Sequence, residues 1–203
     1  MRSAPAGAGN RNSGIVVRLD GGPDLFARRS RRGGLIRFLL SDIYFGARPR
    51  PVRELTVAAE AYRRGIPIAE PMGAMVNWVA PAAYRGAFLT RAMAGMTLWE
   101  FMHTDDDARV RAHVLEQARR AIDTMHRRGL FHADLNLHNL FVTQAGESFT
   151  IVIIDLDKAR LFKVPLPARR RRLNFARLTR SARKLDPHGH YLDPHALAIL
   201  TAR

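Results

Sequence analysis

The sequence predicts an α+β domain that is divided into two lobes. The order of the predicted elements indicates this, because strands with one helix are followed by a long helix, a loop and a buried strand. The length of 203 residues suits such a domain, and a hydrophobic fraction of 47% is enough to bury a core. We expect a flexible N-terminus at residues 1–13, a small antiparallel β lobe at residues 14–90, and a large, mainly helical catalytic lobe with a basic tail at residues 91–203.

The small lobe is predicted to contain a β-hairpin, one helix and two further strands, at residues 14–19 with 25–29, 51–64, 66–79 and 87–91. Two glycines and Pro23 between the first two segments favour a turn. The helix has Pro51 in its first turn and Gly65 just past its end, which are favoured positions for these residues. The apolar stripe predicted for this helix consists of Val52, Leu55, Ala59 and Tyr62.

The large lobe contains the clearest helix of the chain, predicted over residues 105–128. Three aspartates at 105–107 give it an acidic start, which suits the positive end of a helix dipole, and Gly129 ends it. A connector or short helix over residues 95–102 precedes it. A β-branched, buried strand over residues 149–154 follows it.

The chain is strongly basic. Its 33 Lys and Arg residues outnumber 18 Asp and Glu residues, so the formal net charge is +15. Such a charge attracts polyanions, either nucleic acid or a membrane that carries anionic lipid or phosphate groups. Composition alone favours nucleic acid, but no nucleic-acid-binding module is recognisable, so we expect no nucleic-acid partner. The tail, in which residues 169–172 are all arginine, is interpreted either as a solvated face or as a surface for an anionic membrane.

Cysteine is absent, which excludes a disulfide scaffold and a thiolate metal site. The sequence has no apolar run of the length that spans a membrane, and no apolar segment typical of a signal peptide near its start. We therefore expect the protein in the cytoplasm or on the cytoplasmic face of a membrane.

A cluster of polar residues follows the long helix and carries the predicted chemistry. Phosphoryl transfer from ATP needs a carboxylate that orients the acceptor hydroxyl, a carboxylate and an amide that hold the metal, and a cation at the phosphates. Asp134 and Asn139 are five residues apart, and Asp155 follows 16 residues later at the end of the buried strand. This spacing matches that of protein kinases, H-x-D-x-x-x-x-N followed by an Asp. A role in capping the helix and turn would leave the position of Asp155 unexplained.

From this layout we predict a protein-kinase-like, two-lobed fold that uses ATP and Mg²⁺. Asp134 is the predicted catalytic base, and Asn139 and Asp155 are the predicted Mg²⁺ ligands. We expect His132 to hold the loop in place by packing and hydrogen bonding. His138 is interpreted as a solvated loop histidine, with contact to the substrate as the alternative.

These motifs also carry a family resemblance. The segments 132–139 and 153–160 closely resemble the lipopolysaccharide kinases, and most of all those for 3-deoxy-D-manno-octulosonic acid, or Kdo. Further stretches within residues 28–35, 53–71 and 174–184 agree, so the resemblance runs over residues 14–185. It implies ATP-dependent phosphorylation of the 4-hydroxyl of Kdo on Kdo-lipid A. It also implies peripheral attachment to the anionic surface of the bacterial inner membrane, on the cytoplasmic side.

The kinase layout also needs a cation on the third strand and an acidic partner on the helix after it. The second strand of the hairpin has no lysine, and the resemblance points to Arg28, for which the alternative is a solvated strand residue. Glu54 lies roughly 100° from the centre of the predicted apolar stripe and Glu60 roughly 145° from it. Glu54 is therefore the predicted partner of Arg28. Met93 is expected to offer backbone groups to adenine.

A glycine-rich phosphate loop has only one candidate, residues 7–14. No strand is predicted before it, so this stretch is interpreted as part of a mobile tail. Three alternatives stay open. They are another small-molecule or protein kinase with the same loop, a catalytically inactive kinase-like binding protein, and an RNA-binding protein. The missing lysine and the poor glycine loop favour the second, while the third leaves the spacing of Asp134, Asn139 and Asp155 unexplained.

Overall fold

The computed structural model of the protein describes residues 3–5, 14–29 and 43–201. The chain forms two compact units. Unit 1 consists of residues 1–60 and 70–93, and unit 2 of residues 61–69 and 94–203. Compared with the expected lobes, the division falls three residues later, and a short segment that begins in the last turn of the first helix, residues 61–69, belongs to unit 2.

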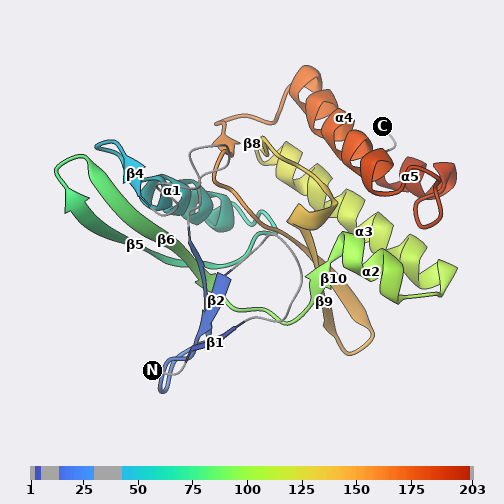
Figure 1. Ribbon diagram of the computed structural model, residues 1–203. Helices are drawn as coiled ribbons and strands as arrows, with labels where there is room; N and C mark the ends of the chain where they lie inside the picture. Colours follow the sequence, from blue (N-terminus) through green and yellow to red (C-terminus); the bar gives the residue numbers. More distant parts are fainter. Residues whose placement is uncertain (1–2, 6–13, 30–42, 202–203) are drawn as a thin grey trace. The chain divides into compact units, whose positions relative to one another are not determined.

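Unit 1 is built on an antiparallel sheet, drawn from blue to green in Figure 1. The strand order is β1-β2-β3-β6-β4, and β5 also pairs with β6. The strands are β1 (Ser3–Pro5), β2 (Gly14–Val17), β3 (Leu25–Arg29), β4 (Tyr44–Phe45), β5 (Pro71–Ala80) and β6 (Ala83–Arg91). The predicted hairpin is confirmed as β2 and β3, and the strand predicted from residue 66 begins only at Pro71.

Strand β1 is not predicted from the sequence. Ala4 lies opposite Val16 in an antiparallel pairing of β1 with β2. The flexibility expected for residues 1–13 stays a prediction. A segment of three residues shows no alternation of polar and apolar side chains that sequence analysis could detect. Residues 6–13, which contain most of the candidate glycine loop, and residues 30–42 lie outside the described residues.

The helix α1 (Arg50–Arg63) forms nearly where it is predicted, but its buried face differs from the predicted stripe. Val52, Ala59 and Tyr62 are exposed. The buried positions are Pro51, Glu54, Ala58 and Ala61. The start of α1 lies on the sheet of unit 1, because the backbone N–H of Arg50 donates to the Tyr84 hydroxyl of β6 at 2.9 Å.

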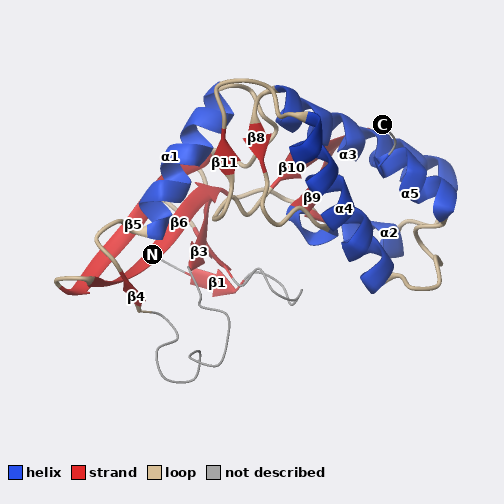
Figure 2. Cartoon of the chain, turned by 90° about the horizontal axis from the view of Figure 1, so that it is seen from above, coloured by secondary structure: helices blue, strands red, loops and turns tan. Residues whose placement is uncertain are grey.

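Unit 2 combines four helices with two small antiparallel sheets, which Figure 2 separates by colour. The helices are α2 (Leu98–Thr104), α3 (Ala108–Arg127), α4 (Ala168–Leu185) and α5 (Pro194–Thr201). One sheet has the order β10-β9-β7 and the other pairs β11 with β8. The strands are β7 (Met96–Thr97), β8 (Leu130–Phe131), β9 (Leu140–Ala145), β10 (Ser148–Ile153) and β11 (Arg160–Leu161), and residues Leu137–Asn139 form a 3-10 turn.

The long helix α3 is shorter at its start than predicted. Asp107 is its N-cap and accepts from the backbone N–H groups of Arg109 and Val110. Asp105 instead ends α2, so the acidic stretch serves two helices. The buried stripe of α3 forms the centre of the core of unit 2 and contains Val114, Leu115, Ala118, Ala121, Ile122 and Met125.

The helix α4 is not predicted from the sequence. It carries seven arginines and one lysine without any acidic residue, and buries only Asn174, Leu178 and Ala182. These three positions are four residues apart, which gives one narrow buried stripe. Within the described residues, no helix is both long and apolar enough to cross a membrane.

Candidate active site

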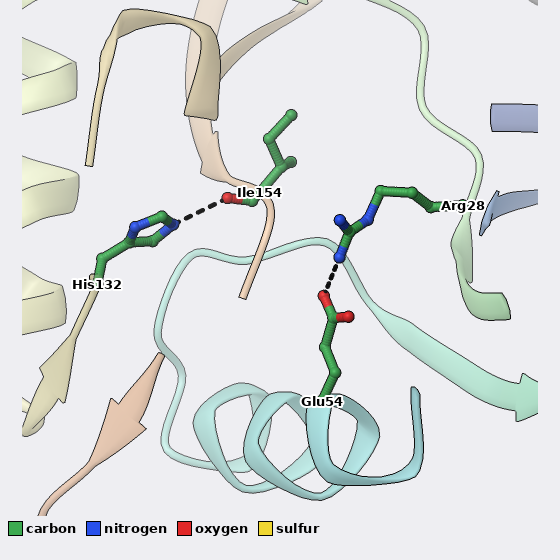
Figure 3. A network of polar contacts seen from close by, with 4 residues as sticks. All are labelled: Arg28, Glu54, His132 and Ile154. Atoms are coloured by element: carbon green, nitrogen blue, oxygen red, sulfur yellow. Dashed lines mark hydrogen bonds and ion pairs between the residues drawn. The ribbon is translucent and has the colours of Figure 1, made fainter. Parts of the chain in front are cut away.

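The loop between β8 and β9 contains the predicted catalytic residues, and His132 holds its start. The imidazole is buried, with Nε2 3.0 Å from the backbone oxygen of Ile154 (Figure 3). The backbone N–H of Asp134 lies 3.2 Å from Nδ1. An amide can only donate and a carbonyl can only accept, so the ring is neutral with its proton on Nε2. Burial lowers the pKa of His132, which favours this neutral form. The expected structural role of His132 is confirmed.

Asn139 closes the same loop. Its Nδ2 donates to the backbone oxygen of Asp134 at 2.8 Å, and its own backbone oxygen accepts from the N–H of Ile154 at 3.0 Å. The residue is 5% exposed, and the hydrogen bond of Nδ2 holds the amide in one orientation. With Nδ2 used by the loop, Oδ1 is the atom that can face a cation.

Asp134 combines a fixed backbone with an exposed side chain. Its backbone oxygen accepts from the side-chain amides of both Asn136, at 2.9 Å, and Asn139, at 2.8 Å. The residue as a whole is exposed to solvent. The carboxylate is therefore accessible to an acceptor molecule while its main chain is held.

Asp155 follows directly after Ile154, whose N–H and C=O both bond to the loop. Asp155 has φ +64°, and it is the one non-glycine residue with positive φ among the described residues. This backbone conformation costs energy for L-residues, although Asp tolerates it better than most. Such conformations gather at functional sites, where the surrounding contacts enforce them. Through Ile154, hydrogen bonds connect the predicted site residues Asp134, Asn139 and Asp155 within unit 2.

A further residue, Asn174 on α4, supports this loop and was not recognised as important from the sequence. It is completely buried. Its Nδ2 donates to the backbone oxygen of His132 at 2.5 Å, and its Oδ1 lies 3.1 Å from Nε2 of His126, which must be the donor. Burial lowers the pKa of His126, and its Nδ1 has no hydrogen-bond partner among the described residues. Asn174 thereby joins α4, the end of α3 and the catalytic loop.

Unit 1 contains the predicted Arg28–Glu54 pair. Nη2 of Arg28 on β3 lies 2.5 Å from Oε1 of Glu54 on α1 (Figure 3). The Glu54 side chain is 2% exposed and that of Arg28 is 20% exposed. Glu60 is half-buried on the same helix. Arg28 is therefore more than a solvated strand residue, while its role toward phosphate stays a prediction.

Two further residues complete the predicted set. Met93 is half-buried in the stretch between β6 and β7, and it is the last residue of unit 1. His138 is half-buried, so it is less exposed than the solvated histidine we expected, and its backbone N–H donates to Oδ1 of Asn136.

Asn139 of the loop and Asp155 after β10 have side chains that fit a magnesium ion. Among the described residues, no group of three or more His, Cys, Asp or Glu side chains is placed to hold a metal. Mg²⁺ does not need such a group, because it keeps several waters and is held by one or two carboxylates together with substrate phosphates. Asn139 and Asp155 offer an amide oxygen and a carboxylate, which are hard ligands of this kind.

Comparison with known structures identifies the fold. The fold is similar to that of a solved chain described as WaaP in complex with acyl carrier protein, with a TM-score of 0.58 and 17% sequence identity. The similarity covers 94% of this chain and 75% of that chain. At this identity the likeness concerns the fold, which is the predicted protein-kinase-like α+β fold.

Sequence comparison defines the family. The model of the lipopolysaccharide kinase (Kdo/WaaP) family matches residues 9–193, and the chain belongs to this family. A 3-deoxy-D-manno-octulosonic acid kinase of Xylella fastidiosa (strain M23) is 35% identical over 91% of this chain and 71% of its own length. The proteins of the same name from Xanthomonas campestris pv. campestris (strain B100) and Stenotrophomonas maltophilia (strain R551-3) are each 31% identical over the same shares. The resemblance stated from the sequence is confirmed.

Proposed function

We propose that the protein is an ATP-dependent kinase that phosphorylates a hydroxyl of Kdo on Kdo-lipid A during lipopolysaccharide core biosynthesis. Its family and the name shared by the relatives support the substrate class. The observation that carries the proposal is the hydrogen-bonded loop in which Ile154 connects the backbones that bear Asp134, Asn139 and Asp155. The loop and Asp155 together supply a base and two oxygen ligands, which phosphoryl transfer requires from a protein.

In the proposed reaction the carboxylate of Asp134 accepts the proton of the sugar hydroxyl. The hydroxyl oxygen then forms a bond to the γ-phosphorus of ATP, and the bond from that phosphorus to the bridging oxygen breaks, so that ADP leaves. Asn139 and Asp155 would hold Mg²⁺. When bound, this ion neutralises charge on the phosphate oxygens.

The remaining predicted contacts concern the nucleotide. Arg28, oriented by Glu54, would provide positive charge to the phosphates in place of the usual lysine, with a fork of N–H groups instead of a point charge. Backbone groups near Met93 would receive adenine. By resemblance to the family, the acceptor is the 4-hydroxyl of Kdo.

The proposed site of action is the cytoplasmic side of the bacterial inner membrane, where the protein would bind peripherally. The formal charge of +15 and the absence of acidic residues from α4 support attraction to an anionic surface. Each cation near such a surface contributes about 1 kcal/mol. Replacing the exposed Arg169, Arg171 and Arg172 with Ser should weaken binding to lipid A vesicles. Tighter binding of the unmodified protein to RNA than to these vesicles, at one ionic strength, would contradict this proposal.

The central test uses labelled ATP, Mg²⁺ and Kdo-lipid A. We expect a labelled glycolipid with the unmodified protein and at most about a hundredth as much with the Asp134→Asn variant, which serves as the control for contaminating kinases. Phosphorus–proton NMR correlation of the product identifies the hydroxyl that carries the phosphate. The proposed activity is refuted if the folded, ATP-binding protein yields no labelled glycolipid. A phosphate on a hydroxyl other than the 4-hydroxyl contradicts only the proposed position of phosphorylation.

A further inference from the structure

Unit 2 contains a basic pocket that the proposed reaction does not use. It has a volume of about 340 Å³ and is lined by Arg64, Arg127, Arg128, Lys163, Val164 and Pro165. Four of these six residues are cationic and none is acidic. Phosphate monoesters are doubly charged and are commonly bound by several arginine and lysine side chains together. The composition of this lining therefore suits such a group.

Three segments of unit 2 build the pocket, and their backbones are fixed where they meet. Nη1 of Arg64 donates to the backbone oxygen of Phe162 at 2.6 Å and to that of Arg128 at 3.2 Å. Gly65 has φ +68°, a left-handed conformation that favours glycine, and the guanidinium of Arg128 lies next to it. Gly129 has φ +84°, and a side chain there would collide with the backbone oxygens of the segment after β11. The lining is thus a defined structure.

The negative ends of the two helices that reach the pocket do not cancel its positive charge. The C-termini of α1 and α3 both lie among the lining segments, and each is equivalent to roughly −0.5 of an elementary charge. Together they offset about one of the four cationic charges. One further cation lies near this segment, because the guanidinium of Arg170 on α4 lies 4.3 Å from the ring centre of Phe162, the residue before Lys163. The pocket therefore offers several cationic side chains to an anion of charge −2.

We propose that this pocket binds a phosphate monoester group, carried either by a membrane lipid or by a soluble phosphate ester. Its lining residues lie outside the catalytic loop, so the inference does not depend on the proposed kinase activity. Val164 is 64% exposed at the pocket, which would allow apolar parts of a lipid to lie next to a bound headgroup.

The test compares two double variants of the full chain that lose the same charge. Arg127→Gln with Lys163→Gln changes two exposed residues of the pocket, whereas Arg109→Gln with Arg183→Gln changes two exposed residues elsewhere. Arg109 lies on the same helix as Arg127 but roughly 27 Å away along its axis. Binding is measured at one ionic strength for two probes. These are inorganic phosphate, followed by NMR of the Gly129 and Val164 amides, and phosphatidylcholine vesicles that contain phosphatidic acid.

We expect the pocket variant to bind at least one probe about tenfold more weakly than the control variant does. A loss for both probes indicates a general phosphate site, and a loss confined to the vesicles identifies a lipid headgroup as the ligand. Vesicles that contain phosphatidylglycerol at the same surface charge should bind the two variants equally, since the phosphate of phosphatidylglycerol is a diester. Equal binding by the two variants for both probes, or no binding by the unmodified protein, would overturn the proposal.

Discussion

The catalytic loop of unit 2 and the Arg28–Glu54 pair of unit 1 are held by different kinds of interaction. In the loop, neutral hydrogen bonds to backbone groups fix His132 and Asn139. In unit 1 one ion pair joins β3 to α1, and its carboxylate is almost completely buried. Loss of a neutral hydrogen bond costs about 1 kcal/mol, whereas a buried charge left without its partner costs about 3–5 kcal/mol. The chemistry of unit 2 can therefore be altered with little loss of stability, while the pair in unit 1 cannot.

The largest expected effect separates chemistry from stability in unit 2. Asp134→Asn should lower kcat by about 10²- to 10⁴-fold, because the variant cannot accept the hydroxyl proton. The side chain is exposed, so the free energy of unfolding should change by less than about 0.5 kcal/mol. Steady-state kinetics and urea unfolding measure the two quantities. A loss confined to ATP affinity would show that Asp134 does not act on the acceptor.

In unit 1 the expected effect falls on stability. Arg28→Ala should lower the free energy of unfolding by about 3–5 kcal/mol, because it removes the guanidinium that pairs with the buried Glu54 carboxylate. The double variant Arg28→Met with Glu54→Leu removes both charges and should recover most of this loss. Urea unfolding of both variants gives the comparison. If the single variant is as stable as the unmodified protein, the pair does not hold α1 to the sheet.

Asn174 tests whether hydrogen bonds from α4 support the catalytic loop. Asn174→Ala should lower the free energy of unfolding by about 2–4 kcal/mol, because the His132 carbonyl and the His126 N–H lose their partner. Asn174→Leu keeps the volume without the hydrogen bonds and should be destabilised similarly. Arg177→Ala, at an exposed position of the same helix, is the control. Full stability of the Leu variant would mean that packing, not hydrogen bonding, is the contribution of this position.

The smallest expected effect is a dependence of stability on pH. All eight histidines lie in unit 2, and burial lowers the pKa of His126 and His132 in the folded protein. The unfolded chain then binds more protons, so stability is full above the unfolded pKa of 6.5 and falls as the pH drops below it. Each histidine can lower the stability by at most about 1.4 kcal/mol for each pH unit of acidification below 6.5. Urea unfolding across this range checks the slope, which His126→Gln should reduce. A stability that is independent of pH here would contradict the buried neutral rings.

The sequence was most informative where function depends on local spacing. Asp134 and Asn139 lie in the loop before β9, and Asp155 lies just after β10, the strand that pairs with β9. Their spacing therefore predicts which groups the backbone can bring together. The sequence predicts Glu54 rather than Glu60 as the partner of Arg28, and the structure contains this pair. The apolar stripe used for that prediction, however, is not the buried face of the helix. The structure buries Glu54 in the middle of the helix face and exposes Val52 and Tyr62. A hydrophobic pattern cannot show that the buried face of a helix is built around a charged residue.

The parts that were not predicted depend on tertiary contacts. The many cations of α4 suggest a solvated segment. Only one residue in four is buried, and this pattern is too sparse to predict an amphipathic helix from the sequence. The sequence feature that points to the buried face of α4 is the spacing of four residues between the uncharged Asn174, Leu178 and Ala182. Strand β1 is even shorter, and it exists through its pairing with β2. Neither element could be identified without its partners.

The backbone of Asp155 places two demands on a single position. The residue there must carry an oxygen that can bind a cation, and it must also accept the left-handed conformation at φ +64°. Among the ordinary amino acids only Asp and Asn meet both demands well, because Glu adds a longer chain without their tolerance of this conformation. Replacement by Ala would add about 1–2 kcal/mol of backbone strain to the loss of the carboxylate. Asn is therefore the substitution that isolates the charge, and the range of residues open to natural variation or to protein engineering at this position is very narrow.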